Sequence, residues 1–92
     1  AAATGVGELA IRVAASTMIV ERMRQGLSPQ ESCERVLEFI RERLHPTETQ
    51  QLGVIALGRD GTAGGASLLP GFTYVVTDRD GTRPEQRRAI GE

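Results

Sequence analysis

The spacing of the apolar residues changes at His45-Pro46, and this change constrains the fold more than any other feature of the chain. Between Ser28 and Pro46 the apolar residues recur at helical spacing, with glutamates and arginines on the opposite side. After Pro46 the apolar runs are short and bounded by turn residues, which is typical of strands. Helices followed by strands favour an α+β fold, in which two helices pack as one layer on an antiparallel sheet of about three strands.

The second expected helix has a clear beginning and a clear end. Ser28-Pro29-Gln30-Glu31 places an N-cap serine before a proline at the first helical position, with a capping-box glutamate three residues after the serine. The pattern predicts an amphipathic helix that ends near His45-Pro46. Its apolar side consists of Cys33, Val36, Leu37, Ile40 and Leu44.

The first helix is predicted from Glu8 to about Gln25. Glu8 and Arg12 lie four residues apart and can pair on one face. Residues 9–20 are apolar almost all round, and Arg12 is the only charge among them. Because a helix without a polar face is buried on several sides, more protein is expected around this helix than the chain supplies.

Three strands are expected after the second helix, in an antiparallel sheet with one edge left open. They are Leu52–Leu57, Thr62–Ser67 and Phe72–Thr77, with a hairpin turn at Asp60-Gly61 and a stop at Asp78-Arg79-Asp80-Gly81. Gly64 and Gly65 would weaken their strand unless another group packs closely over the backbone. The polar residues 82–92 are expected to follow the surface.

The composition indicates an incomplete domain, which we assign to residues 1–92 as a whole. Apolar residues make up 39% of the 92 residues, and only two phenylalanines and one tyrosine are aromatic, so the chain has little with which to build its own core. The net charge of −1 and the lack of a basic stripe argue against binding to nucleic acid. No apolar run approaches the ~18 residues of a membrane span. From the charge and the apolar runs together, neither a nucleic acid nor a membrane is an expected partner.

Cysteine and histidine each occur once, which limits the metal and redox chemistry that the chain can support. Cys33 has no partner for a disulfide, and a His/Cys metal cluster cannot form with His45 alone. We expect Cys33 to be a small core residue and His45 to be a surface residue near a helix C-terminus. Asp78 and Asp80 lack the further oxygen ligands of a calcium loop, and turn chemistry explains them better. Neither a metal nor a cofactor is therefore expected.

One segment suggests a functional site, Thr4-Gly5-Val6-Gly7-Glu8, which we interpret as a glycine-flanked loop leading into a helix. Such a loop exposes backbone N–H groups, and the helix dipole favours negative charge beside them, so it can bind an anion or a developing oxyanion. A plain helix entry with Thr4 as its cap explains the same residues. Thr4 is not expected to be a nucleophile, because an N-terminal threonine uses its own α-amine as the base and three alanines precede Thr4.

Four segments occur in an order and spacing typical of one family. They are Ala2-Ala3-Thr4-Gly5-Val6-Gly7-Glu8 with Ile11-Arg12, Val20-Glu21-Arg22-Met23-Arg24-Gln25-Gly26 with Ser28-Pro29 and Cys33, the hairpin from Gly53-Val54-Ile55-Ala56-Leu57 to Gly65-Ala66, and Gly71-Phe72-Thr73-Tyr74-Val75-Val76. Together they resemble the C-terminal part of the β-chain of glycosylasparaginase, in the asparaginase branch of the N-terminal nucleophile hydrolases. The last segment is more similar to the glycosylasparaginase group than to plant-type asparaginases, and the resemblance spans essentially all 92 residues.

The resemblance implies a self-cleaving precursor and an αββα sandwich, of which this chain is one part. In that family the new N-terminal threonine attacks the side-chain amide of an asparagine derivative, and the Thr-Gly motif forms the oxyanion hole. By resemblance, Thr4 and Gly5 form the oxyanion hole, and the Gly5 carbonyl helps to hold the α-amino group of the substrate. The family's threonine nucleophile lies before this motif, as do the arginine and aspartate that bind the α-carboxylate and α-amine, so none of the three can be assigned here.

The resemblance also implies partners, and it leaves the substrate open. The expected partners are the preceding part of the same enzyme (the α-chain and the N-terminal part of the β-chain) in an (αβ)2 assembly, and a small asparagine-derived substrate. An isoaspartyl dipeptidase or L-asparaginase of the same superfamily is the nearest alternative, since the residues that distinguish the pockets lie outside this chain. A non-catalytic interaction module is the alternative from another class. The chain alone is expected to be inactive.

Overall fold

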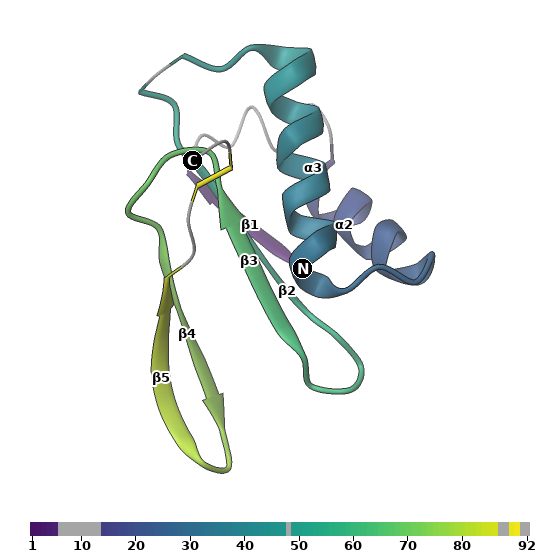
Figure 1. Ribbon diagram of the computed structural model, residues 1–92, viewed down its shortest axis with the longest axis vertical. Coiled ribbons are helices and arrows are strands. Elements are labelled where there is room, and N and C mark those ends of the chain that lie inside the picture. The colour runs from purple at the N-terminus through teal and green to yellow at the C-terminus, as the bar shows by residue number, and fades with distance from the viewer. Residues whose placement is uncertain (6–13, 48, 87–88, 91–92) are drawn as a thin grey trace.

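The computed structural model describes residues 1–5, 14–47, 49–86 and 89–90, which form two helices and five strands (Figure 1). In chain order these are β1 (Ala2–Gly5), α2 (Ala15–Arg24), α3 (Pro29–Leu44), β2 (Leu52–Leu57), β3 (Ala63–Ser67), β4 (Thr73–Asp78) and β5 (Gly81–Gln86). The α+β class, with two helices and a three-stranded antiparallel sheet, is confirmed. Neither helix of the described part is long and apolar enough to cross a membrane.

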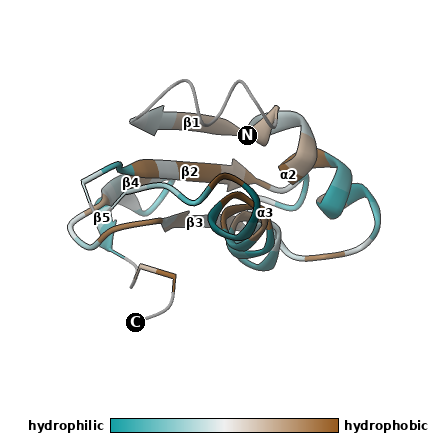
Figure 2. Cartoon of the chain, turned by 90° about the horizontal axis from the view of Figure 1, so that it is seen from above, coloured by the Kyte–Doolittle hydropathy of each residue, from teal (hydrophilic) through white to brown (hydrophobic). Residues whose placement is uncertain are grey.

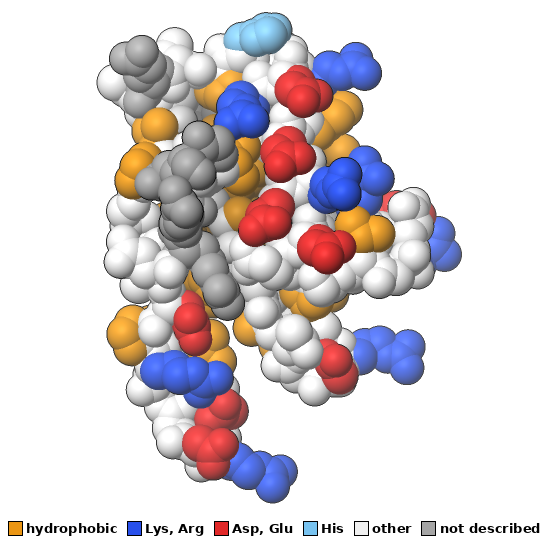
Figure 3. All heavy atoms as spheres, viewed as in Figure 1, with side chains coloured by type: hydrophobic (Ala, Val, Ile, Leu, Met, Phe, Trp, Pro, Cys, Tyr) orange, Lys and Arg blue, Asp and Glu red, His pale blue; other side chains and the backbone are white. Residues whose placement is uncertain are grey.

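Helix α3 begins and ends where the sequence predicts. The Ser28 hydroxyl accepts the backbone N–H of Glu31 at 3.1 Å, and His45 ends the helix in the left-handed conformation with φ of 47°. The side facing the core is buried, with Cys33, Leu37 and Ile40 at 0% exposure. On the opposite side, acidic and basic side chains lie next to one another (Figure 3), as expected for a solvent-facing helix surface.

The single continuous helix that was expected from Glu8 to Gln25 is wrong at Ala14. Ala14 has φ of 49° and ψ of 55°, and a left-handed residue cannot lie inside a right-handed helix. Helix α2 therefore starts at Ala15 and ends at Arg24 within the predicted range. The expected pairing of Glu8 with Arg12 lies outside the described residues.

The three-stranded sheet has the order β1-β2-β3, and both pairings are antiparallel. Its third strand is β1, whereas the sequence placed residues 72–77 in this position and read the Thr4-Gly5 segment as a loop. Ala3 of β1 lies opposite Val54 of β2, and Val54 lies opposite Ala66 of β3. Alanine and glycine are poor strand formers, so the pairing of β1 comes from the neighbouring strand and not from its own composition.

Residues 81–86 lie on the surface, as predicted for residues 82–92, but they form strand β5, which the sequence did not predict. Strands β4 and β5 make a two-stranded hairpin with Asp78 opposite Gly81, so the expected stop is in fact the hairpin turn. The Asp78 carboxylate accepts the Asp80 N–H at 2.8 Å and the Arg83 guanidinium at 2.9 Å. The bond from Arg83 is the main reason that the pKa of Asp78 lies below its usual value.

The described elements lie in three layers, with the helices on one face of the β1-β2-β3 sheet and the β4-β5 hairpin on the other (Figure 2). Two adjacent glycines of β3 reveal this arrangement, since neighbouring strand residues face opposite ways. A Cβ at Gly64 would meet the backbone of Gln30 at the start of α3. A Cβ at Gly65 would lie 2.5 Å from the ring of Tyr74 in β4. Other groups therefore pack closely over both glycines, which is the condition under which the sequence allowed them in a strand.

The core lies between the helices and the sheet. Its largest fully buried side chains are Ile19, Leu37, Ile40, Leu52, Val36 and Val54. These come from both helices and from β2, so the sheet face that carries Val54 is the one that the helices cover. The other face carries Ile55 and Leu57, which remain 38% and 68% exposed.

Candidate functional site

Thr4 and Gly5 lie at the C-terminal end of β1, and both are exposed. Thr4 is opposite Gly53, and Gly5 is opposite Leu52 at the beginning of β2. The two residues therefore occupy a strand end, which corrects the loop that the sequence suggested. The rest of that motif, Val6, Gly7 and Glu8, lies outside the described residues.

Two hydrogen bonds on the side of β3 that faces away from β2 show which way the backbone groups of the sheet point. The Gly65 N–H donates to the Gln30 side chain at 2.9 Å, and the Ser67 carbonyl accepts the Ile90 N–H at 3.0 Å. Gly65 and Ser67 therefore direct their backbone groups away from β2. In an antiparallel pair the bonded residues alternate, so Gly64 and Ala66 are the residues of β3 that bond to β2.

The same alternation extends across the sheet to the Thr-Gly pair. Gly53 lies opposite Ser67, so its backbone groups point toward β1 and meet those of Thr4. The Thr4 N–H is thus used within the sheet, and the next N–H along the strand, that of Gly5, points away from β2. This end of β1 can accordingly offer two donors to a ligand, the Thr4 hydroxyl and the Gly5 N–H.

The conformation of Gly5 requires a glycine. Its φ is 115°, a region that other residues rarely adopt. A Cβ at this position would also collide with the backbone carbonyl of Gln51. A glycine is therefore required at position 5 because its strand lies so close to Gln51, and this requirement does not depend on a ligand.

The Gln51 side chain braces the same end of the sheet. Its Oε1 atom accepts the N–H groups of Leu52 at 3.1 Å and Leu69 at 2.8 Å, and its Nε2 atom donates to the Leu69 carbonyl at 2.8 Å. These bonds tie the start of β2 to the segment after β3. Because Gly5 rests against the Gln51 carbonyl, the brace also supports the end of β1.

A small hollow of about 180 Å³ lies beside Thr4, on the face of the sheet opposite the helices. It is lined by Ala2, Ala3, Thr4, Gly53, Ile55, Phe72 and Tyr74. The Phe72 ring lies directly over Gly53, where a Cβ would be 2.5 Å from Cε1, and the Phe72 and Tyr74 rings are 6.1 Å apart. The sequence identified Thr4 but not Gly53, Gln51 or Phe72, which come to the site from distant parts of the chain.

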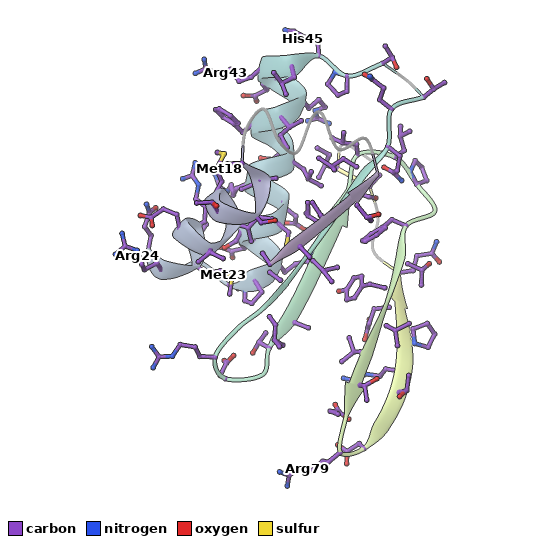
Figure 4. All side chains as sticks on the ribbon, turned by 180° about the vertical axis from the view of Figure 1, so that it is seen from behind. Met18, Met23, Arg24, Arg43, His45 and Arg79 are labelled. Atoms are coloured by element: carbon purple, nitrogen blue, oxygen red, sulfur yellow. The ribbon has the colours of Figure 1, made fainter. Side chains whose placement is uncertain are left out.

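The hollow offers donors and an apolar wall, and the described residues that line it include no acidic or basic side chain. Cys33 is not a candidate nucleophile, because it is fully buried and its burial raises the pKa of the thiol to about 12. His45 is exposed at the C-terminal end of α3, as predicted (Figure 4). Within the described part of the chain, no group of three or more His, Cys, Asp or Glu side chains could hold a metal ion.

The same region of the sequence is similar to known proteins of one family. The sequence profile of a family described as Asparaginase matches residues 1–82, a range that includes the lining of the hollow. The chain is also similar to an N(4)-(Beta-N-acetylglucosaminyl)-L-asparaginase of Elizabethkingia miricola, with 37% identity over 89 residues. That alignment covers 92% of this chain but 26% of the relative, so the chain spans about a quarter of the length of the protein it matches.

Proposed function

This chain belongs to the asparaginase family, and we propose that it forms the oxyanion-binding part of an amidohydrolase that cleaves the side-chain amide of N4-substituted asparagine. One observation carries the proposal. At the exposed end of β1, a threonine hydroxyl is followed directly by a glycine N–H that the sheet leaves unused.

These two donors suit the chemistry of amide hydrolysis. When a nucleophile attacks the amide carbon, the carbonyl oxygen gains negative charge and needs donors at about 2.7–3.1 Å. Thr4 and Gly5 would supply them from a strand end that Gln51 holds in place. Such donors are effective because they are already oriented when the charge develops. The Gly5 carbonyl would accept a hydrogen bond from the α-amino group of the substrate.

The remaining groups would come from protein outside this chain. The described lining of the hollow provides no general base, and Thr4 lies within a strand, preceded by three alanines. By resemblance to the asparaginase family, the nucleophile would be the N-terminal threonine of a self-cleaved precursor, and the residues that bind the α-carboxylate and α-amine would also lie outside this chain. The complete enzyme would be an (αβ)2 assembly.

The substrate is the least constrained part of the proposal. The name of the Elizabethkingia relative favours asparagine linked to N-acetylglucosamine. An isoaspartyl dipeptidase or L-asparaginase would use the same two donors, so they give no means of discrimination. A non-catalytic interaction module would need neither donor.

The experiment is a substrate panel for the protein made from its complete reading frame. We expect turnover of glycosylasparagine or an asparagine anilide and little turnover of free asparagine or an isoaspartyl dipeptide. The 92-residue chain alone should hydrolyse none of them, because it lacks the nucleophile. Turnover by the chain alone would show that the nucleophile has been misplaced, and an inactive complete protein would favour the interaction module.

A further inference from the structure

Gln51, the residue before β2, uses both ends of its side-chain amide. Oε1 accepts the N–H groups of Leu52 at 3.1 Å and Leu69 at 2.8 Å, and Nε2 donates to the Leu69 carbonyl at 2.8 Å. The Leu69 carbonyl also accepts the Ser67 hydroxyl at 2.7 Å. A reversed amide would set its own N–H groups against those of Leu52 and Leu69, so these partners allow the amide one orientation only.

The Leu52 N–H that this amide binds belongs to the same peptide plane as the Gln51 carbonyl. In a trans peptide such as this one, the N–H and the carbonyl point in opposite directions. The N–H points to the Gln51 side chain, and the carbonyl points to Gly5, where an added Cβ would collide with it. The 51–52 peptide is therefore held on one side by the Gln51 amide and rests against Gly5 on the other.

Gly5 depends on this contact because no side chain of its own restricts its backbone. A glycine can adopt many values of φ, and the observed value of 115° is one of several that it tolerates. The Gln51 carbonyl limits this choice from outside. If the 51–52 peptide rotated, the carbonyl would move and the Gly5 N–H would lose its fixed direction. A donor stabilises a developing oxyanion only when it is already oriented, at about 2.7–3.1 Å.

We propose that Gln51 is a positioning residue for the reaction: its side-chain amide holds the 51–52 peptide plane, and this plane aims the Gly5 N–H at the oxyanion. The proposal rests on the proposed function, since the oxyanion is that of the amide substrate. The described lining of the hollow beside Thr4 does not include Gln51. Gln51 therefore acts through Gly5, and its loss should slow the chemical step more than it weakens substrate binding.

The chain offers two matched control positions. Gln30 makes similar bonds on the other side of the sheet, where its Oε1 atom accepts the Gly65 N–H at 2.9 Å and its Nε2 atom donates to Glu34 at 2.9 Å. The Ser67 hydroxyl belongs to the Gln51 network, but it donates to Leu69 and not to the 51–52 peptide. Substitution at either position removes side-chain hydrogen bonds of the sheet without releasing the peptide that supports Gly5.

Steady-state kinetics with an asparagine anilide test the proposal on the protein made from its complete reading frame, with a melting curve for every variant. Gln51→Met should lower kcat by about 10-fold and change KM little, because the Gly5 donor is misdirected but not removed. Gln51→Asn, whose shorter amide cannot reach Leu52 and Leu69 together, should show a smaller loss of the same kind and carries the test if Gln51→Met does not fold. Gln30→Met and Ser67→Ala should lower the melting temperature and leave kcat intact.

Three results would overturn the proposal. Unchanged kcat in folded Gln51 variants with a lowered melting temperature would show that the amide is structural only. An equal loss of kcat in Gln30→Met would show that any loosening of the sheet slows the reaction, and a rise in KM with kcat unchanged would assign Gln51 to substrate binding. Thr4→Val distinguishes the two proposals. If it lowers kcat while the Gln51 variants do not, the positioning role alone fails, and if the complete protein hydrolyses no asparagine derivative, the proposed function fails with it.

Discussion

At the scale of single residues, the register separates two neighbours that the sequence treats as one motif. Thr4 has its backbone N–H within the sheet and can offer a ligand only its hydroxyl as a donor, whereas Gly5 offers its N–H. A substitution of Gly5 is a poor test of function, because any Cβ would collide with the Gln51 carbonyl before a substrate is considered. Thr4 is the residue at which catalysis and structure can be separated.

We predict that Thr4→Val in the complete enzyme lowers kcat by about 10²–10³ and changes KM little, because it removes a donor used only when charge develops. Thr4→Ser is the matched control, since it keeps the hydroxyl and should retain most of the activity. If the Thr4 hydroxyl has only a structural role, Thr4→Val should instead lower the free energy of unfolding by about 1 kcal/mol and leave kcat intact. Kinetics and a melting curve on the same variants distinguish the two outcomes.

A second residue-scale prediction concerns the buried thiol of Cys33. Its burial raises the pKa from 9.0 to about 12, so the reactive thiolate is scarce at neutral pH. We expect no alkylation by iodoacetamide at pH 8 until denaturant is added. The free energy of unfolding should also decrease above pH 9, since the unfolded thiol loses its proton before the folded one does, and this contribution is lost as the pH approaches 12. Rapid labelling of the folded protein would contradict the assigned burial.

At the scale of elements, the sequence predicts what local chemistry controls. Helix α3 is predicted at both ends, because residues at each end set the boundary. Ser28 caps the beginning of the helix, and His45-Pro46 ends it. Strands β2 and β3 are predicted because a short apolar run and the Asp60-Gly61 turn are local signals. The Asp60 carboxylate accepts the Thr62 N–H at 3.0 Å, which stabilises that turn and lowers the pKa of Asp60.

The elements that the sequence does not predict depend on distant partners. Strand β1 has no strand-forming composition and pairs only because β2, about 50 residues later, presents a complementary edge. Strand β5 contains Pro84 and charged residues, which favour a surface segment until β4 pairs with it. The site likewise divides into residues that the local sequence indicates and residues that only the fold brings in. Thr4 and Gly5 belong to the first kind, because they stand in a recognisable motif. Gln51 and Phe72 reach it only through the fold.

The two glycines of β3 give a prediction at this scale. Gly64→Ala should destabilise the protein by about 1–3 kcal/mol, because the new methyl group meets the rigid backbone of α3. Gly65→Ala should be less harmful, since it meets the Tyr74 ring, which can shift. Adding Tyr74→Ala should partly rescue Gly65→Ala but not Gly64→Ala. Urea unfolding of the complete protein measures the two glycine variants, each with and without Tyr74→Ala, and an equal rescue of both would contradict the two-sided packing of β3.

At the scale of the whole molecule, the described residues leave apolar surface uncovered on the sheet as well as on α2. The apolar first helix was expected to lack protein around it; residues 9–13 of that stretch lie outside the described residues, and within α2 Ala15 and Ile19 are buried while Val20 is 49% exposed. Among the described residues, the most exposed large apolar side chains are Leu57 at 68% and Val75 at 62%. Both line a hollow of about 420 Å³ between the β1-β2-β3 sheet and β4, on the face opposite the helices.

This hollow makes a prediction about the isolated chain. Burial of apolar surface contributes about 25 cal/mol per Å², so side chains such as Leu57 and Val75 forgo stabilisation while they stay in water. We expect the 92-residue chain to bind a hydrophobic dye and to self-associate at micromolar concentration. Leu57→Lys should reduce both effects, whereas Val20→Lys, an equally polar change on the helical side, should alter them much less.

In the complete protein, Leu57→Lys should be harmful, whereas in the isolated chain it should be beneficial. If the remaining protein fills the hollow, Leu57→Lys buries an unpaired charge and should lower the free energy of unfolding by several kcal/mol. Val20→Lys should again be milder than Leu57→Lys. Light scattering and dye fluorescence on the isolated chain, with denaturant unfolding of the complete protein, test both halves. A monodisperse, cooperatively melting monomer that binds no dye would show that the chain needs no further protein over this face.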